Sequence, residues 1–367
     1  MPGPDQQPIL ALGLMSGTSM DGVDAALLVT DGIEVERFGA ALSTRYTPED
    51  RAVLRAAVGG AAGDEAEAAA ARAVTDVHIQ AVQALLKLAG CASQDVGVIG
   101  FHGHTIHHDP ANGVTRQIGD AARLAAITGI DVVSDFRAAD VAAGGQGAPL
   151  APVFHAALAK GLVGRSGPVA VLNLGGVGNV TWIGGDQTLL AFDTGPGCAL
   201  IDDWVRARTG NAFDVDGALA SAGIVDEAVL AALLADPYFS LVPPKSLDRD
   251  HFDTGSVEGL SPADGAAVLS AFTATAVARG ATWFEAPPCR WLVTGGGRHN
   301  AALMRGLADQ LSAPVEAVEA VGWDGDALEA QAFAYLAARS LAGLPLSFPQ
   351  TTGIAAPLTG GRLTTAT

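Results

Sequence analysis

Apolar positions along this chain gather in short runs that end at glycine-rich turns, and this pattern predicts strand–turn–strand units. Residues 10–29, LALGLMSGTSMDGVDAALLV, read as an apolar strand, a turn and a second apolar strand. Residues 169–183, VAVLNLGGVGNVTWI, repeat the arrangement. A third apolar run opens the segment 291–300, WLVTGGGRHN, and meets three glycines before a helical pattern begins. Two hairpins about half the chain apart, followed by a third glycine turn, predict two related halves of an α/β fold.

Helical patterns fall between the predicted strands. Residues 47–58 open with an N-cap threonine and a proline, which is typical of a helix start. Residues 64–89 are rich in alanine, the strongest helix former. Asp120 precedes a further helical pattern and is a candidate N-cap. Residues 328–343 show an amphipathic helical period.

The first turn carries groups that suit a phosphate and its metal ion. Gly17 and Gly22 permit sharp backbone angles and can present N–H groups to a ligand. Thr18 and Ser19 add hydroxyl donors. Asp21 adds a carboxylate of the kind that holds Mg2+, directly or through water. An ordinary hairpin turn, which Asp-Gly alone would justify, is the alternative.

Composition narrows the class of protein. The chain has 367 residues, enough for two domains, and 49% of them are hydrophobic while 16% are charged, which is typical of a globular protein. The formal net charge of -18 argues against nucleic-acid binding. No apolar run is long enough for a membrane span, and the N-terminus does not resemble a signal peptide. The three cysteines form neither a disulfide framework nor a metal pattern, which fits a reducing cytoplasm.

Asp193 is the strongest candidate for chemistry. We expect a strand to end at Phe192 and to place Asp193 at its tip, with a turn at 194–197 and a helix from Cys198. A carboxylate in that position suits a general base. A helix cap and an Mg2+ ligand are the alternatives. The Pro-rich segment 241–252 is expected to be a structural loop without chemistry.

Two further groups of polar residues follow predicted strands. The strand 96–101 is expected to lead into a loop with four histidines, for which a metal site is one interpretation, although no carboxylate or cysteine completes a ligand spacing. Arg137 follows the strand that begins at Val132 and can bind a carboxylate with two hydrogen bonds. A structural Arg–Asp pair is the alternative there. The histidines are His102, His104, His107 and His108.

Nearly the whole chain resembles the family of 1,6-anhydro-N-acetylmuramic acid kinases, within the superfamily of sugar kinases, Hsp70 and actin. The matching stretches include GLMSGTSMDGVDAAL, FHGHTIHHDP, DFRAADVAAGGQGAPL, NLGGVGNVT, FDTGPGCALIDDW, PPKSLDRDHF and LEAQAFAYLAARSLAGLP. The resemblance implies two ribonuclease-H-like domains around an ATP cleft. We expect the first domain at 1–145, the second at 146–327, and a C-terminal segment, 328–367, that packs back on the first.

The resemblance also implies an activity. The family uses MgATP to open the 1,6-anhydro ring with water and to phosphorylate O6, which gives N-acetylmuramic acid 6-phosphate and ADP in cell-wall recycling. A homodimer in the cytoplasm, with small-molecule substrates and neither nucleic acid nor membrane as a partner, is the corresponding expectation. A conventional kinase of a free amino sugar, a nucleotide-binding module of the Hsp70 and actin type, and a metal-dependent hydrolase are the alternatives.

Carried onto this sequence, the resemblance implies roles for individual residues. Asp193 would be the catalytic base and Asp21 the residue near Mg2+. His104 and Cys198 depart from the family pattern, which commonly has Gln and Asn there. The nucleotide would meet Gly17, Thr18, Ser19, Met20, Asp21, Gly22, Val23, Asp24, Gly175, Gly176, Gly295, Gly296, Gly297 and Asn300. The sugar would meet His102, His104, Thr105, Gln117, Asp120, Arg137 and Gln146.

Overall fold

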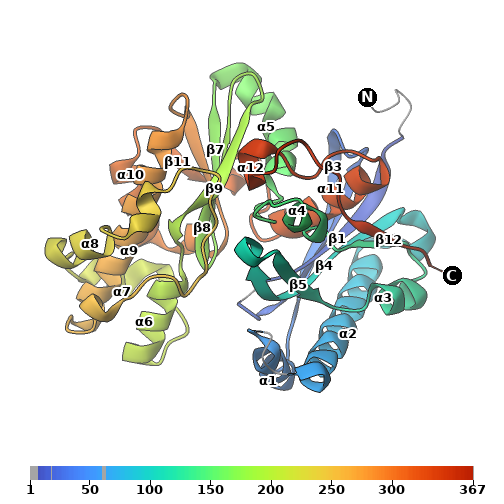
Figure 1. Ribbon diagram of the computed structural model, residues 1–367, viewed down its shortest axis with the longest axis horizontal. Coiled ribbons are helices and arrows are strands. Elements are labelled where there is room, and N and C mark those ends of the chain that lie inside the picture. Colours follow the sequence, from blue (N-terminus) through green and yellow to red (C-terminus); the bar gives the residue numbers. More distant parts are fainter. Residues whose placement is uncertain (1–6, 18, 60–62, 367) are drawn as a thin grey trace. The chain divides into compact units, whose positions relative to one another are not determined.

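The computed structural model describes residues 7–17, 19–59 and 63–366, which form two compact units (Figure 1). The first unit comprises Met1–Leu158 and Ala327–Thr367, and the second comprises Ala159–Asp326. Each unit is built around its own β-sheet. The predicted domain boundaries at residues 145 and 327 stay a prediction.

The first unit contains a mixed sheet with the order β12-β6-β4-β1-β2-β3, and β5 pairs with β4. Strands β1, β2 and β3 form an antiparallel meander, and β4 and β6 continue the sheet parallel to β1. The strands are β1 (Ile9–Ser16), β2 (Gly22–Thr30), β3 (Val35–Arg45), β4 (Val98–Asp109), β5 (Val114–Ile118), β6 (Val132–Ser134) and β12 (Arg362–Thr364). The helices are α1 (Pro48–Ala57), α2 (Gly63–Ala89), α3 (Ala121–Thr128), α4 (Ala138–Ala142), α11 (Leu328–Leu341) and α12 (Pro349–Thr352), and α5 (Pro152–Ser166) begins in this unit.

The second unit repeats the same strand order. Its sheet runs β11-β10-β7-β8-β9, with an antiparallel meander β7-β8-β9 and with β10 and β11 parallel to β7. The strands are β7 (Val169–Leu174), β8 (Val177–Ile183), β9 (Leu189–Pro196), β10 (Arg290–Thr294) and β11 (Val315–Ala317). The helices are α6 (Ala199–Thr209), α7 (Ala218–Ala222), α8 (Glu227–Leu233), α9 (Pro262–Gly280) and α10 (Ala301–Gln310). This repeated order confirms the predicted ribonuclease-H-like fold.

Short 3-10 helices complete the secondary structure. They lie at Ser93–Asp95, Pro110–Asn112, Val215–Gly217, Pro237–Ser240, Gly255–Val257, Ala281–Trp283, Gly296–His299 and Val318–Val321.

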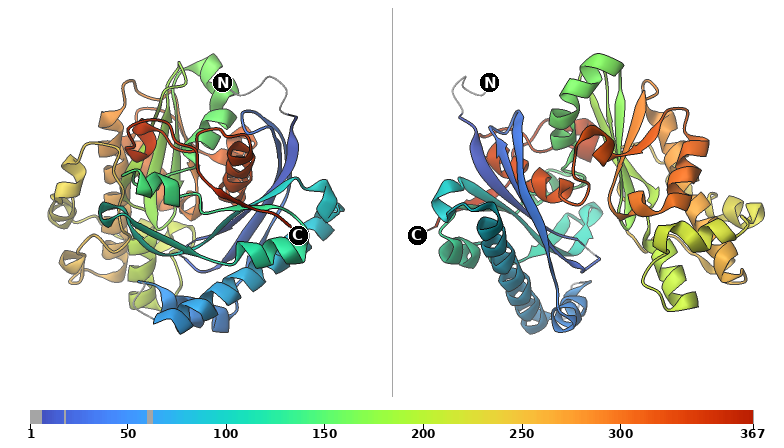
Figure 2. Two further views of the ribbon diagram at one scale, coloured as in Figure 1. Left: turned by 45° about the vertical axis from the view of Figure 1, so that its right-hand side comes forward. Right: turned by 180° about the vertical axis from the view of Figure 1, so that it is seen from behind.

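Side-chain alternation in β1 and β4 assigns one helix to each face of the first sheet. Leu12 and Leu14 belong to the core that α2 completes. The intervening position, Gly13, faces α11, and so does Gly100 of β4. A Cβ at Gly13 would lie 1.7 Å from the Ala330 carbonyl oxygen. Because neither position has a side chain, the helix backbone rests directly on the sheet. Figures 1 and 2 show α2 in blue and α11 in red on opposite sides of these strands.

The same contact explains why α11 departs from the amphipathic pattern predicted for it. Residues 330–339 are all buried, because the helix has the sheet on one side and other parts of the first unit around it. Tyr335 donates a hydrogen bond to the Ile33 carbonyl oxygen, and Arg339 donates one to the Gly32 carbonyl oxygen. Its helical period is therefore that of a buried helix with small residues toward the sheet.

Helix starts follow the sequence closely. Thr47 caps α1 with a reciprocal bond from Asp50, and Pro48 occupies the first turn. Asp120 caps α3 by accepting a hydrogen bond from the Arg123 N–H. Ser261 caps α9. These local polar contacts are encoded by neighbouring residues, which is why the sequence predicts them well.

Two predicted strand ends are wrong. The strand predicted at 96–101 is β4, which continues to Asp109 because β5 pairs with it from His104 to Asp109. The four histidines therefore lie on a strand and not in a loop. Likewise β9 continues past Phe192 to Pro196, so Asp193 lies inside the strand and not at its tip. A non-local partner strand extends each element beyond its apolar run.

We predict that the contact between α11 and the sheet dominates the stability of the first unit. Gly13→Ala forces the Ala330 carbonyl to move and is expected to cost about 3 kcal/mol or more, which appears as a fall of several degrees in the thermal midpoint. Gly161→Ala, an exposed position in α5 where a Cβ meets nothing within 4 Å, is the matched control and should raise the midpoint slightly. Equal midpoints for the two variants would contradict the prediction.

Candidate functional site

The β1–β2 turn presents its polar groups to solvent. The Met20 N–H donates to the Gly17 carbonyl oxygen at 3.1 Å, and Met20 has a positive φ of 57°. Ser19 and Asp21 are exposed, and the Asp21 backbone carbonyl accepts from the Tyr46 N–H. Thr18 lies outside the described residues. The exposed Asp21 carboxylate is a hard oxygen ligand, so its chemistry and position fit a role beside Mg2+.

The residues that follow this turn have structural surroundings. Gly22 lies so close to β3 that a Cβ would be 2.5 Å from the Thr44 carbonyl oxygen. Val23 is fully buried in the core against α2. Asp24 is half-buried and pairs with Met15 across the hairpin. The buried side chain of Val23 argues against a side-chain contact with a nucleotide, and only its backbone is open to the predicted role.

The glycines of the three turns fall into two groups by the space around them. A Cβ at Gly17, Gly175 or Gly176 would meet nothing closer than 3.6 Å, and a Cβ at Gly296 would meet nothing within 4 Å. None of these four has a positive φ. Packing and backbone strain therefore do not require glycine there, whereas close approach of a ligand to the backbone would.

Gly295 and Gly297 belong to the other group. Gly295 has a φ of +77°, and a Cβ on Gly297 would lie 2.6 Å from the Leu174 Cβ and 2.9 Å from the Cys198 sulfur. Burial raises the pKa of the Cys198 thiol to about 12. This thiol packs, with Leu174, against the third turn at Gly297.

The side chains that follow the third turn bind other protein groups. Asn300 is buried and caps α10 by accepting a hydrogen bond from the Leu303 N–H. Arg298 has 3% of its side chain exposed and forms ion pairs with Glu319 and Asp326. The pKa of Glu319 is lowered: burial opposes the shift, while backbone hydrogen bonds and the Arg298 charge cause it. A nucleotide contact by Asn300 would therefore be through its backbone.

Arg137 and His102 form a polar pair in the first unit. Arg137 donates through Nε to His102 Nε2 at 3.0 Å and through Nη1 to the Gly147 carbonyl oxygen at 2.8 Å. The other ring nitrogen, Nδ1, donates to the Gly103 carbonyl oxygen, so His102 is neutral with its proton on Nδ1. Burial and then the Arg137 charge hold the pKa of His102 well below its ordinary value. This arrangement fixes the guanidinium in place, and its role toward a substrate carboxylate stays a prediction.

A chain of hydrogen bonds joins four more side chains near that pair. Gln117 donates to Thr105 Oγ1 and to Thr115 Oγ1. Thr115 contacts His108 Nδ1 at 2.9 Å, and His108 Nε2 donates to the Gln146 carbonyl oxygen at 3.0 Å. The structure thus brings Thr105, Gln117 and the backbone of Gln146 into one network. Asp120 is not part of it, because its carboxylate caps α3.

His104 lies apart from the other predicted sugar residues. It is fully buried, and its Nδ1 lies 2.9 Å from the hydroxyl of Ser16, which in turn contacts the Tyr46 hydroxyl at 2.8 Å. Its Nε2 has no hydrogen-bond partner in the described part of the chain, and the same holds for Nε2 of the buried His78. Burial lowers the pKa of each of these two histidines to about 4. A side-chain contact between His104 and a sugar is not supported.

The histidines do not form a metal centre. Across the described ranges, no three His, Cys, Asp or Glu side chains come together to hold a metal ion. The rings of His102, His104 and His108 bind different protein groups instead. Nor does any helix in the described ranges have the length and apolar character to cross a membrane.

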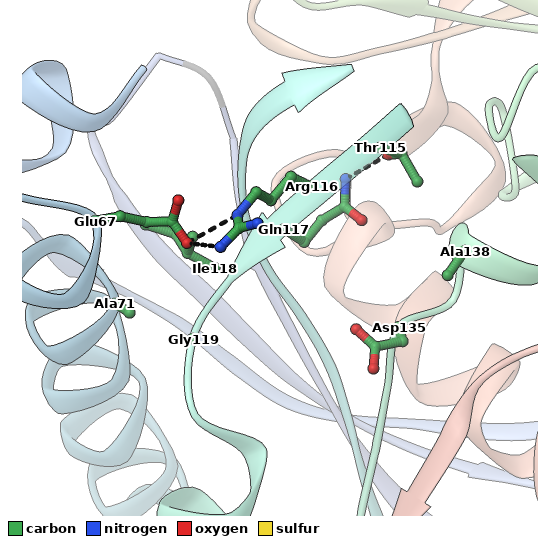
Figure 3. A pocket seen from close by; sticks show the side chains of 9 residues that line it. All are labelled: Glu67, Ala71, Thr115, Arg116, Gln117, Ile118, Gly119, Asp135 and Ala138. Atoms are coloured by element: carbon green, nitrogen blue, oxygen red, sulfur yellow. Dashed lines mark hydrogen bonds and ion pairs between the residues drawn. The ribbon is translucent and has the colours of Figure 1, made fainter. Parts of the chain in front are cut away.

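A cavity of about 340 Å³ opens beside the Gln117 network (Figure 3). Its wall includes Gln117, Gly119, the Glu67–Arg116 ion pair and Asp135. Asp135 has a positive φ of 55°, which a non-glycine residue adopts rarely, and it lies across the cavity from β5. The size is at the small end for ligand pockets. Sequence reasoning did not assign Asp135 a role, because strain at one residue leaves no mark in a hydrophobic pattern.

Asp193 is held by a β-bulge and by the segment after α8. The pairing of β8 with β9 shifts register next to Asp193, which lies opposite Asn179. The Asp193 N–H donates to the Lys245 carbonyl oxygen at 3.0 Å, and the Leu247 N–H donates to Asp193 Oδ2 at 2.8 Å. The Tyr238 hydroxyl donates to the Asp193 carbonyl oxygen. The carboxylate is thus oriented by a backbone donor, and it is neither a helix cap nor at a strand tip.

Sequence reasoning missed the partners of Asp193. The segment 241–252 is irregular, as the sequence predicts, although the sequence pattern indicates only a structural loop there. In the structure Lys245 and Leu247 contact Asp193 across about fifty residues of sequence. The signal that could have found them is Lys245 itself, which directly follows two consecutive prolines in an irregular segment.

The repeated sheet and the oriented aspartate define a protein of the ribonuclease-H-like class with two units. The family model for anhydro-N-acetylmuramic acid kinase matches residues 9–366. A curated protein of that name from Paramagnetospirillum magneticum is 59% identical, and the match covers 96% of this chain and 99% of the relative. Another, from Rhodospirillum rubrum, is 57% identical, and the match covers 96% of this chain and 93% of the relative. The chain belongs to the anhydro-N-acetylmuramic acid kinase family.

Solved structures show more distant likenesses. Component A of the (R)-2-hydroxyglutaryl-CoA dehydratase of Acidaminococcus fermentans is 14% identical, with a TM-score of 0.46 over 90% of this chain and 99% of that one. A ROK family glucokinase of Streptomyces griseus is 16% identical, with a TM-score of 0.40 over 89% and 99%.

We predict that the buried neutral histidines make the first unit sensitive to acid. His104 ionises near pH 6.5 when unfolded and near pH 4 when folded, so the unfolded chain binds more protons between these values. The contribution of His104 to the free energy of unfolding is fully present above pH 6.5. It is lost as the pH falls toward 4, by up to about 3 kcal/mol for one such group. His104→Gln should therefore lose less stability between pH 7.5 and 5 than the wild type, measured from thermal midpoints. The exposed His299→Gln is the control, and an equal pH dependence in all three proteins would contradict the prediction.

We also predict that Gly296 and Gly297 respond differently to alanine. Gly296→Ala should keep the thermal midpoint, because its Cβ meets nothing, but should raise KM for ATP about tenfold or more if the turn backbone meets the nucleotide. Gly297→Ala should lower the midpoint, because its Cβ meets Leu174. An unchanged KM for ATP in a folded Gly296→Ala protein would remove this turn from the nucleotide site.

Proposed function

We propose that this protein opens the 1,6-anhydro ring of 1,6-anhydro-N-acetylmuramic acid with water and transfers the γ-phosphoryl group of ATP to O6. The products are N-acetylmuramic acid 6-phosphate and ADP. The observation that carries the proposal is the family match over residues 9–366, together with relatives of that name at more than 50% identity. The reaction belongs to the reuse of cell-wall sugars.

Asp193 acts as the general base in this proposal. It takes a proton from the water that attacks the anomeric carbon, and the departing O6 accepts the phosphoryl group. The hydrogen bond from the Leu247 N–H to Oδ2 supports this role, because it orients the carboxylate. The step requires the ionised form of Asp193 and correct placement of water, sugar and ATP.

The open glycine positions support a nucleotide site made from backbone. Gly17, Gly175, Gly176 and Gly296 leave room for phosphate oxygens next to N–H groups. Asp21 would hold Mg2+, directly or through water, and the ion would neutralise charge on the transferred phosphoryl group. The chain has a net charge of -18, so it does not attract an anionic ligand through its overall charge. Backbone donors and Mg2+ would supply the attraction at the site instead.

Arg137, with Gln117, Thr105 and Gln146 nearby, is the proposed sugar site. The guanidinium is aligned by His102 and Gly147 and suits the lactyl carboxylate of the substrate. We also propose a homodimer in the cytoplasm. The dimer rests on the family resemblance, and the three free cysteines agree with a reducing compartment.

The test is an ADP-release assay with MgATP and the anhydro sugar, run beside free N-acetylmuramic acid. We expect release with the anhydro sugar only. Asp193→Asn should keep its fold and ATP binding but lose at least about a hundredfold in kcat, because the base contributes at least that much. Release with the free sugar alone would favour a conventional amino-sugar kinase, and ATP binding without turnover on either would favour a non-enzymatic module.

A further inference from the structure

Three backbone and hydroxyl contacts clamp Asp193 onto one short segment, 238–247. The Lys245 carbonyl accepts from the Asp193 N–H, the Tyr238 hydroxyl donates to the Asp193 carbonyl, and the Leu247 N–H donates to the carboxylate. These three contacts of Asp193 therefore depend on the conformation of this segment. Any group that fixes the segment also fixes the carboxylate.

Lys245 is the group that closes the segment on itself. Its side chain is 8% exposed, and its ammonium donates to the Tyr238 carbonyl oxygen at 2.9 Å. The same nitrogen lies 4.3 Å from the centre of the Tyr238 ring and 6.0 Å from the centre of the Phe192 ring. An ammonium in such a place loses much of its hydration, and aromatic faces and one carbonyl compensate only in part.

The charges of Lys245 and Asp193 influence each other. Burial lowers the pKa of Lys245 below the ordinary value of lysine, and the Asp193 carboxylate opposes that shift. Such an interaction is reciprocal, because the same electrostatic energy stabilises both charged forms. The positive charge of Lys245 therefore favours the ionised form of Asp193.

Other charged groups on the elements around this segment face partners of their own. His251 pairs with Asp236 at 3.3 Å, beside the Tyr238 ring. Arg279 of α9 donates to the Leu234 carbonyl oxygen. Arg249 pairs with Asp203 and Asp250. Lys245 is thus the cation in the described part of this segment whose field is directed at Asp193.

We propose that Lys245 is a positioning residue for the general base: its ammonium keeps the Asp193 carboxylate ionised and, through Tyr238, holds the segment that orients it. The proposal rests on the proposed function, in which Asp193 must be ionised to accept a proton from water. It assigns a role to the segment 241–252 that the hydrophobic pattern did not indicate.

The test is the pH dependence of kcat/KM for the anhydro sugar in Lys245→Met, which has an uncharged side chain of similar length. Loss of the charge should move the acid limb of the profile upward by about one pH unit, so that activity at the acid end falls about tenfold and recovers toward the wild type at pH 8.5. Lys245→Arg keeps the charge and should restore most of the acid limb. A uniform loss at every pH would show a purely structural role and overturn the proposal.

Arg249→Gln is the matched control, because it removes a positive charge two residues after the segment, and this charge faces Asp203 instead of Asp193. Its acid limb should coincide with that of the wild type. The ionisation of ATP is common to all these proteins, so the difference between profiles isolates the enzyme group. A shift in Arg249→Gln equal to that in Lys245→Met would mean a general charge effect and would also overturn the proposal.

A reciprocal measurement needs no change at Lys245 and no turnover. In Asp193→Asn the Lys245 amine, followed by NMR of labelled lysine side chains, should titrate at a lower pH than in the wild type, because the carboxylate charge is gone. An unchanged titration would show that the two charges do not interact. This result is independent of the assay, so a failure of the proposed activity and a failure of the Lys245 proposal are distinguishable.

Discussion

The first unit depends on the direct contact between the backbone of α11 and the sheet at Gly13 and Gly100. A Cβ at either glycine would lie within 2.0 Å of a helix carbonyl oxygen, so no side chain separates the two layers. This approach places Phe333 of α11 against His102, with 4.6 Å between ring centres. His102 in turn accepts the hydrogen bond that aligns Arg137. A packing constraint in the core thus determines the orientation of a candidate binding residue.

The second unit repeats the strand order but positions its candidate residue by a different device. Asp193 pairs with Asn179 directly beside the bulge between β8 and β9, and bulges commonly re-aim a side chain near active sites. The bulge alone does not orient Asp193, because its backbone N–H donates to the Lys245 carbonyl oxygen and its carboxylate accepts from the Leu247 N–H, both far along the chain. The two units share a strand order, but close helix packing positions the candidate residue in the first unit and the segment 238–247 positions it in the second.

The sequence predicts what local chemistry encodes. Apolar runs and glycine turns predict the strand–turn–strand units and their repetition in two halves. Capping residues predict the helix starts at Thr47 and Asp120. Features that depend on distant partners could not be predicted in this way. Pairing with β5 extends β4 through the histidines, pairing with β8 extends β9 past Phe192, and Lys245 meets Asp193 only after folding. A residue in a recognised motif can also have a purely local contact: the Asn300 side chain, next to the third glycine turn, caps α10.

Charge explains why these non-local contacts matter for binding a polyanion. With 39 acidic and 21 basic residues, the chain has few cations to spare for phosphates. Those near the candidate sites already have partners: the buried Arg298 pairs with Glu319 and Asp326, the half-buried Arg137 with His102 and Gly147, and the buried Lys245 with Tyr238. Each therefore shapes a turn or orients another group. In the proposed function, phosphate recognition therefore falls to backbone N–H groups at the open glycines, which contribute positive ends of dipoles without adding a mobile charge. A site of this kind tolerates an acidic protein surface, because its donors are fixed by the fold.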